Sequence, residues 1–172
     1  MAIFNRSKKK DEGEADVKPS VVPAPGQAVG RPGAKSEPAA EPVMEQAPSG
    51  NYRKVMVKPG SRGWGKGLVI APKPGRDLIY SVTGGGIHPV AQRIADLTGG
   101  RTFDGFKSKA KFEEIACAVI DCGGTARIGV YPMKGVLTVD VHGASPSGPL
   151  MRFINEENFV SGISVTDIEV VE

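Results

Sequence analysis

Ile115-Ala-Cys-Ala-Val-Ile120 is a nearly continuous apolar run, and Asp121-Cys-Gly-Gly-Thr125 follows it directly. A short run of this kind, ended by glycines, is typical of a strand that is buried on both faces at the centre of a sheet. The two glycines allow a tight turn and let the backbone approach a ligand closely. This stretch therefore predicts the central strand of the fold and a candidate site at its end.

Further strands are predicted on both sides of this run, because short β-rich segments alternate with glycine and proline. They cover residues 53–57, 68–71, 77–83, 126–131, 136–141 and 163–170. A helix is predicted to begin at Pro89 and to end at Gly99, and a second short helix to begin near Pro149. These helices are too few for a regular β-α-β alternation. We therefore expect an α+β domain with a largely antiparallel sheet of about seven strands and two or three helices.

Residues 1–50 differ in composition from the rest of the chain. They hold seven of the 14 prolines, and their seven basic residues balance seven acidic ones. Such a segment buries too little apolar surface to offset its chain entropy. The sequence predicts a disordered Pro/Ala/Glu-rich arm over residues 1–50, either a passive tail or a tether, and a folded domain over residues 51–172.

Several classes of protein are excluded by composition. No run approaches the roughly 18 apolar residues that cross a bilayer, and the first residues do not read as a secretory signal. Two cysteines cannot form a disulfide framework, and two histidines argue against a histidine-based metal site. We expect a cytoplasmic protein with reduced thiols, no cofactor and no metal.

Charge is uneven within the expected domain. Residues 51–134 carry 14 basic and six acidic side chains, whereas residues 135–172 carry one basic and six acidic. The imbalance indicates either a basic face for a phosphorylated or acidic partner or a chance distribution over a solvated surface.

Cys122 is the candidate nucleophile. Backbone N–H groups of Gly123, Gly124 and Thr125 could converge on an anion, and Arg127 could add positive charge. A thiol beside such donors has its reactive thiolate favoured and could accept and release a phosphoryl group. The alternative is a hairpin turn with Cys122 as a small core residue. Cys117, inside the apolar run, is predicted to belong to the core.

Three other loops carry alternatives. Ser145, Ser147 and Gly148 could hold a phosphate at the start of the second helix, or could simply cap it. Residues 83–88, which end in His88, offer the same two interpretations before the first helix. The Gly-rich loop around Trp64 could stack on single-stranded nucleic acid, but a tryptophan that covers the edge of the core is favoured.

An ordered set of short motifs resembles a known family. From about Lys58 to Val171 the chain is similar to the enzyme IIB domain of the glucitol/sorbitol-specific phosphotransferase system, the N-terminal part of the IIBC component. The matching segments are residues 63–65, 74–75, 80–84, 88–89, 94–99, 104–107, 119–125, 129–132, 147–150 and 160–162.

The resemblance implies a function. It implies that Cys122 accepts a phosphoryl group from phosphohistidine on the IIA protein and passes it to sorbitol, or a related polyol, during transport through the membrane component IIC. Gly123, Gly124, Thr125, Arg127, Ser145, Ser147 and Gly148 are then the expected phosphate-binding residues. The chain would be cytoplasmic and peripherally associated with the membrane through IIC, with no nucleic acid as partner. The alternative is a non-catalytic regulatory or nucleic-acid-binding module of the same fold.

Overall fold

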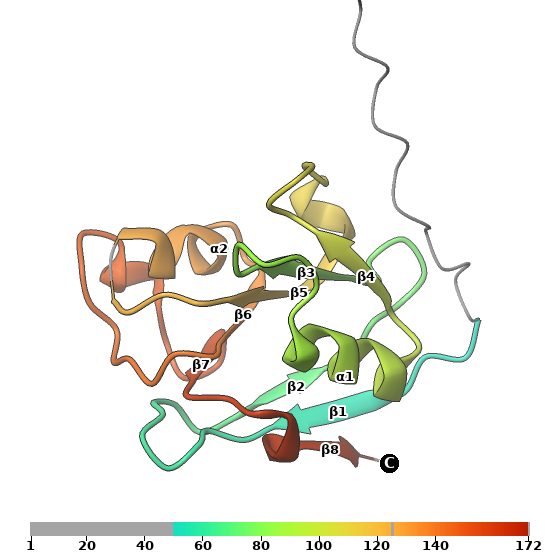
Figure 1. Ribbon diagram of the computed structural model, residues 1–172, viewed down its shortest axis with the longest axis horizontal. Coiled ribbons are helices and arrows are strands. Elements are labelled where there is room, and N and C mark those ends of the chain that lie inside the picture. The colour runs from blue at the N-terminus through green and yellow to red at the C-terminus, as the bar shows by residue number, and fades with distance from the viewer. Residues whose placement is uncertain (1–49, 125, 172) are drawn as a thin grey trace, which may run out of the picture. The chain divides into compact units, whose positions relative to one another are not determined.

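Five parallel strands form the central sheet of the protein, which is described by a computed structural model over residues 50–124 and 126–171 (Figure 1). Their order across the sheet is β4-β3-β5-β6-β7, and every neighbouring pair is parallel. The strands are β3 (Leu78–Val82), β4 (Arg101–Asp104), β5 (Ile115–Ile120), β6 (Leu137–Asp140) and β7 (Phe159–Ser161). Apart from residue 50, the arm expected at residues 1–50 lies outside the described residues.

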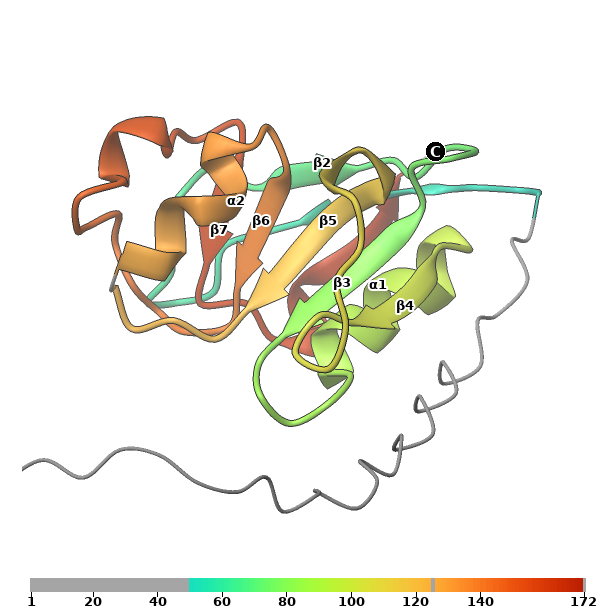
Figure 2. The ribbon, with the colours of Figure 1, turned by 90° about the horizontal axis from the view of Figure 1, so that it is seen from above.

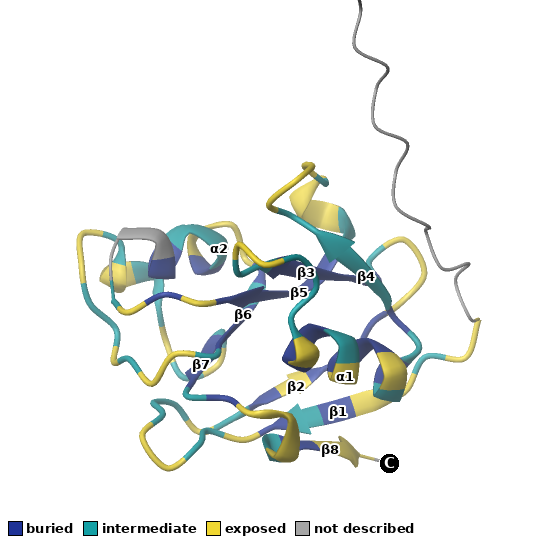
Figure 3. Cartoon of the chain, in the orientation of Figure 1, coloured by how far each residue is buried: buried dark blue, intermediate teal, exposed yellow. Residues whose placement is uncertain are grey.

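The prediction of a central, doubly buried strand is confirmed. All six residues of β5 are buried, and the strand pairs with β3 on one side and with β6 on the other (Figure 2). Its side chains enter apolar clusters on both faces of the sheet, with Cys117 and Val119 in one cluster and Ala118 in another. Figure 3 shows this buried interior along the middle of the sheet.

A second, antiparallel sheet and the main helix cover one face of the central sheet (Figure 1). The second sheet has the order β2-β1-β8, with β1 at Lys54–Val57, β2 at Leu68–Ile70 and β8 at Ile168–Val171. Helix α1 (Pro89–Thr98) starts at the predicted proline and ends at Gly99, whose φ is 77°. Val90 and Ile94 of α1 pack into the same apolar cluster as Val119.

Short helical segments accompany the connections between the later strands. They are η1 (Phe112–Glu114), η2 (Ala126–Gly129), α2 (Val130–Met133) and η3 (Met151–Phe153), with η4 (Val165–Asp167) before β8. Tyr131 of α2 packs against the cluster that contains Tyr80 and Ala118, and Ile128 of η2 packs against Ile120. These short turns therefore cover the face of the sheet that α1 leaves open.

The expectation of a largely antiparallel seven-stranded sheet is wrong. Parallel strands need crossover connections, which are usually regular helices. Here α1 alone is a regular crossover helix, between β3 and β4, while the other three crossovers use helical segments of three or four residues. Counting helices in the sequence therefore underestimated the number of parallel connections.

Four local predictions are also corrected. Residues 126–131, predicted as a strand, form η2 and the start of α2. The strand predicted at 163–170 is interrupted by η4, where the Ser164 N–H donates to Asp167 Oδ2 at 2.8 Å. The helix expected near Pro149 is the three-residue η3. Strands β4 and β7 were not predicted.

The carboxyl ends of the five parallel strands meet along one border of the sheet, which we call the carboxyl edge. The chain proceeds outward from β3 to β4 on one side and from β5 to β6 and β7 on the other, so strand order reverses between β3 and β5. In open sheets of this kind, ligands bind outside the carboxyl ends at such a reversal. Cys122 lies just beyond β5, at this reversal.

None of the helices within the described residues is both long enough and apolar enough to cross a membrane.

Candidate functional site at the carboxyl edge

Cys122 follows β5 by two residues and is largely covered. Only 7% of the residue is exposed, and it packs in an apolar cluster with Ile120, Ile128 and Phe159. Ala144 and Trp64 pack against the same cluster. The predicted position at the end of the central strand is correct, but the thiol is more enclosed than a residue at the open mouth of a loop. The neighbouring Gly123 is exposed.

Asp140 anchors the start of the Cys122 loop. It is the last residue of β6 and is fully buried, opposite Ile120 of β5. Its Oδ1 accepts the N–H of Cys122 and the N–H of His142, each at 3.0 Å. One carboxylate oxygen therefore ties together the two chain segments that leave the sheet after β5 and β6. The N–H of Cys122 is therefore used within the fold and is separate from the donors expected to bind a ligand, which are the N–H groups of Gly123, Gly124 and Thr125.

The second oxygen of Asp140 has no hydrogen-bond partner among the described residues. Burial raises the pKa of this carboxyl group to about 6, although the hydrogen bonds from Cys122 and His142 act in the opposite direction. A buried polar atom without a partner is costly and is uncommon in folded proteins. Sequence analysis missed Asp140. The available signal was an acidic residue at the end of a strand in which Thr138 and Asp140 occupy alternate, buried positions.

The two glycines after Cys122 meet different neighbours. Gly124 has a φ of 98°, and its carbonyl accepts a hydrogen bond from the Ser147 hydroxyl. A β-carbon on Gly124 would stand 2.7 Å from Ser147 Oγ, whereas one on Gly123 would stand 3.5 Å from His142 Nε2. The structure thus brings the predicted residues Gly123, Gly124 and Ser147 together with a histidine.

The other predicted phosphate-binding residues are less closely tied to Cys122. Ser145 and Gly148 are exposed in the loop after β6, and Gly148 has a φ of 77°. The three-residue η3 that follows is too short to provide the helix dipole on which the interpretation of this loop relied. Thr125 and the side chain of Arg127 lie outside the described part of the chain.

His142 and Asp121 form a pair beside Cys122. His142 Nδ1 lies 3.7 Å from Asp121 Oδ1, and the two side chains are 57% and 52% exposed. Such an exposed pair contributes little to stability. Neither residue was predicted as a site residue by itself. Their positions directly after β6 and β5, at neighbouring strand ends, could have indicated them only if the strands had been predicted to be parallel.

The loop around Trp64 belongs to the core, as the favoured interpretation predicted. The backbone N–H of Trp64 donates to Ser161 Oγ at 2.8 Å, and the backbone N–H of Ser161 donates to the Trp64 carbonyl at 3.0 Å. The loop therefore runs along the side of β7 that has no neighbouring strand in the central sheet. A β-carbon on Gly63 would stand 1.9 Å from the Ser161 carbonyl oxygen. The glycine therefore permits the close approach, and the indole packs 6.0 Å from the Phe159 ring, measured between ring centroids. The partly buried ring thus covers the edge of the core.

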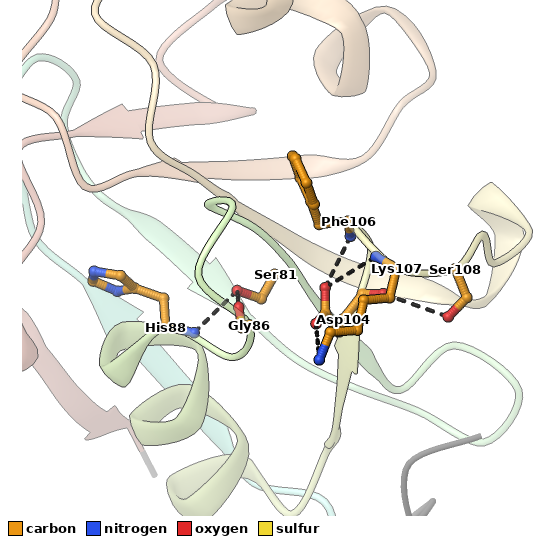
Figure 4. Close-up of polar contacts among 7 residues, drawn as sticks. All are labelled: Ser81, Gly86, His88, Asp104, Phe106, Lys107 and Ser108. Atoms are coloured by element: carbon orange, nitrogen blue, oxygen red, sulfur yellow. Dashed lines mark hydrogen bonds and ion pairs between the residues drawn. The ribbon is translucent and has the colours of Figure 1, made fainter. Parts of the chain in front are cut away.

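The loop after β3 acts as a helix cap, again as favoured. His88 is the N-cap of α1, and its Nδ1 accepts the Val90 N–H at 3.2 Å. Its own N–H donates to Ser81 Oγ, which in turn donates to the Gly86 carbonyl (Figure 4). Asp104 organises the neighbouring loop in the same figure by accepting the N–H groups of Phe106 and Lys107.

Cys117 is confirmed as a core residue. It is fully buried in the cluster between the two sheets, and burial raises the pKa of its thiol. A neutral, enclosed thiol is a poor nucleophile. Of the two cysteines, only Cys122 is at the carboxyl edge.

Comparison with known proteins identifies relatives of this domain. Residues 54–172 match the family described as the sorbitol phosphotransferase enzyme II N-terminus. The chain is also 38% identical over 122 residues to the PTS system glucitol/sorbitol-specific EIIB component of Clostridium beijerinckii, an alignment that covers 70% of this chain. It spans about a third, 36%, of the length of that relative. No solved structure matches. The family match includes Cys122 and the eight strands of the described residues, and the chain belongs to the family of the sorbitol phosphotransferase enzyme II N-terminus.

Proposed function

We propose that this domain is a IIB-type phosphoryl carrier and that Cys122 is its acceptor. The thiolate would take a phosphoryl group from phosphohistidine on a IIA protein and pass it to sorbitol or a related polyol presented by a membrane IIC component. The observation that carries the proposal is the position of Cys122 at the carboxyl edge, where strand order reverses, in a chain whose family match extends over residues 54–172.

The chemistry fits the surroundings of Cys122. In the first transfer, the thiolate attacks phosphorus, an S–P bond forms and the N–P bond to the donor imidazole breaks. In the second, a polyol hydroxyl attacks, an O–P bond forms, the hydroxyl proton leaves and the thiolate is released. A phosphoryl group needs donors for its equatorial oxygens during in-line transfer. Gly123, Gly124, Thr125, Arg127, Ser145, Ser147 and Gly148 remain the proposed phosphate-binding residues.

The burial of Cys122 restricts how a phosphoryl donor can reach its sulfur. With 7% of the residue exposed, an in-line approach to the sulfur requires the surrounding loops to open or the donor to enter past Gly123. We propose that docking of the phosphorylated partner opens the loop at residues 121–124.

A paired substitution tests the acceptor. Histidine-phosphorylated IIA protein of the sorbitol type is incubated with the wild-type chain, with Cys122→Ser and with Cys117→Ser, and the labelled peptide is identified by mass spectrometry. We expect label on the Cys122 peptide in the wild type and in Cys117→Ser, and no thiol-linked label in Cys122→Ser. Equal labelling of the two variants would defeat the proposal.

The nucleic-acid-binding alternative rests on the positive charge balance and on the loop around Trp64. This ring is partly buried and packs beside Phe159, which leaves less of it open for stacking. A salt-dependent gel shift with RNA remains its direct test.

A further inference from the structure

The imidazole of His142 lies against the residues on either side of Cys122. Its Nδ1 is 3.7 Å from Oδ1 of Asp121, the residue before the cysteine. Its Nε2 is 3.5 Å from the position that a β-carbon would take on Gly123, the residue after it. The ring therefore reaches from one neighbour of Cys122 to the other, and 57% of the side chain remains open to a ligand.

The fold holds His142 in this place. The N–H groups of His142 and Cys122 donate to the same oxygen of the buried Asp140, each at 3.0 Å. Val141, between Asp140 and His142, is also hydrogen-bonded to the β5 end, since its N–H donates to Ile120 O at 2.9 Å. The two loops consequently leave the sheet side by side from one anchor.

A phosphoryl group on Cys122 would meet negative charge in this environment. Asp121 is the preceding residue, and the Asp140 carboxylate accepts the N–H of Cys122 itself. A phosphate monoester carries about −1.5 to −2 charges at neutral pH, so both carboxylates would oppose it. A protonated imidazole at the position of His142 offsets that repulsion and supplies a charge-assisted hydrogen bond.

We propose that protonated His142, with Nδ1 turned to Asp121, donates from Nε2 to the phosphoryl oxygens on Cys122. The inference rests on the proposed function, because it adds a ligand to the same phosphoryl group. His142 keeps its proton throughout: the S–P bond forms, the N–P bond of the donor breaks, and the departing donor imidazole takes its proton from solvent. His142 is thus an oxyanion ligand and not the acid or base of the transfer.

The second histidine provides a matched control. His88 is also at the carboxyl edge, but its Nδ1 is used as the acceptor that caps α1. An Asn side chain also caps helices well, so His88→Asn removes an imidazole without removing the cap. We place no phosphoryl contact at His88.

The test is the initial rate of Cys122 labelling by histidine-phosphorylated IIA protein, measured as a function of pH. At about pH 6, where an ordinary imidazole is largely protonated, His142→Gln should be slower than wild type by about ten- to a hundredfold, the value of one charge-assisted hydrogen bond. The ratio of the two rates should fall toward one as the pH rises to about 8, where an ordinary imidazole is neutral.

Two further variants separate charge from structure. His142→Lys keeps a positive charge and should be faster than His142→Gln at every pH, whereas His88→Asn should match the wild type. Among the described residues, Asp121 and Asp140 face His142, and Arg62 lies against the next residue, Gly143.

The outcomes distinguish the two proposals. If the wild type is not labelled, the proposed function fails and this inference fails with it. If the wild type is labelled and His142→Gln shows the same rates and pH profile, only the role of His142 is overturned. A measurement without substitution guards against misfolded variants: ring ¹⁵N resonances of His142 should shift when Cys122 is phosphorylated while those of His88 stay in place. Unchanged His142 resonances would contradict the contact.

Discussion

Two buried aspartates occupy opposite borders of the central sheet, and they differ in their hydrogen-bond partners and in the direction of their pKa shifts. Asp77, just before β3, is held by Arg101 through Nε at 2.9 Å and Nη2 at 3.0 Å, and by the Tyr52 hydroxyl at 2.9 Å. Asp140, at the end of β6, is held through one oxygen by two backbone amides, and its other oxygen has no partner among the described residues. The Arg101 hydrogen bonds lower the pKa of Asp77, whereas burial raises the pKa of Asp140 to about 6.

The contrast separates a structural site from a functional one within a single sheet. At the border that Asp77 occupies, a buried charge has been given a bidentate ion pair, which fixes the starts of β3 and β4. At the carboxyl edge, the same chemical group is left partly unsatisfied next to the proposed acceptor. Local rules of packing are commonly broken at functional sites and kept elsewhere. Two predictions test this contrast, and a third examines the backbone of the carboxyl edge itself.

The largest effect is expected at Asp77. Asp77→Ala leaves the largely buried Arg101 guanidinium without its carboxylate, and breaking a buried pair in this way costs about 3–5 kcal/mol. Urea unfolding measures it, with exposed Asp96→Ala as a control expected within about 0.5 kcal/mol of wild type. Because the pKa of Asp77 is lowered on folding, its contribution is complete above the ordinary aspartate pKa of 3.8 and is lost as the pH falls below it. A loss smaller than about 1 kcal/mol at neutral pH would contradict the structural role.

The next largest effect is expected at Asp140, where folding stability should depend on pH with the opposite sign. The raised pKa means that the folded state binds a proton that the unfolded state releases, so stability should fall as the pH rises from about 4 to about 6, by up to about 3 kcal/mol. Asp140→Asn keeps an acceptor oxygen for the two amides and cannot ionise. Urea unfolding at a series of pH values should show this fall in the wild type and not in the variant. Identical slopes in both proteins would place the titration elsewhere.

The smallest effect distinguishes the two glycines at the carboxyl edge. Gly124→Ala puts a β-carbon on a residue with φ of 98° and 2.7 Å from Ser147 Oγ, so it should destabilise by about 1–2 kcal/mol and slow labelling of Cys122. Gly123→Ala makes only ordinary contact with His142, at 3.5 Å, and should stay within about 0.5 kcal/mol of wild type. Thermal unfolding of the two variants compares them directly. Equal melting temperatures would show that Gly124 is not needed for its conformation.

The sequence predicted individual strands and helices better than the way in which the strands pair. The strand at residues 115–120 and the helix that begins at Pro89 were found from apolar runs and breakers. The direction of the strands was not predicted, because hydrophobic periodicity shows which side chains are buried but not which strands pair. Strand β4 was missed because Arg101-Thr-Phe-Asp104 contains no apolar run and is only partly buried. Residues 126–131 alternate like a strand, but they lie in the crossover between β5 and β6, where they form short helical turns and Ile128 is buried.

Only the part of the candidate site that lies in one continuous segment was predicted from the sequence. The motif at residues 121–124 could be interpreted from glycine chemistry alone. Asp140 and His142 could not, because their role depends on β6 lying beside β5 in a parallel register, with Asp140 opposite Ile120. An antiparallel pairing would have placed the residues after β6 at the far end of β5. The error in the fold class therefore also removed the second half of the site.

Trp64 gives the protein an intrinsic optical reporter. It is the only tryptophan in the sequence, and it packs in the same apolar cluster as Cys122. Indole emission responds to nearby sulfur and to changes in local polarity, so chemistry at the thiol should register as a change in fluorescence intensity. Stopped-flow measurements could then follow each turnover in real time, on the unlabelled chain, without radioactive phosphate.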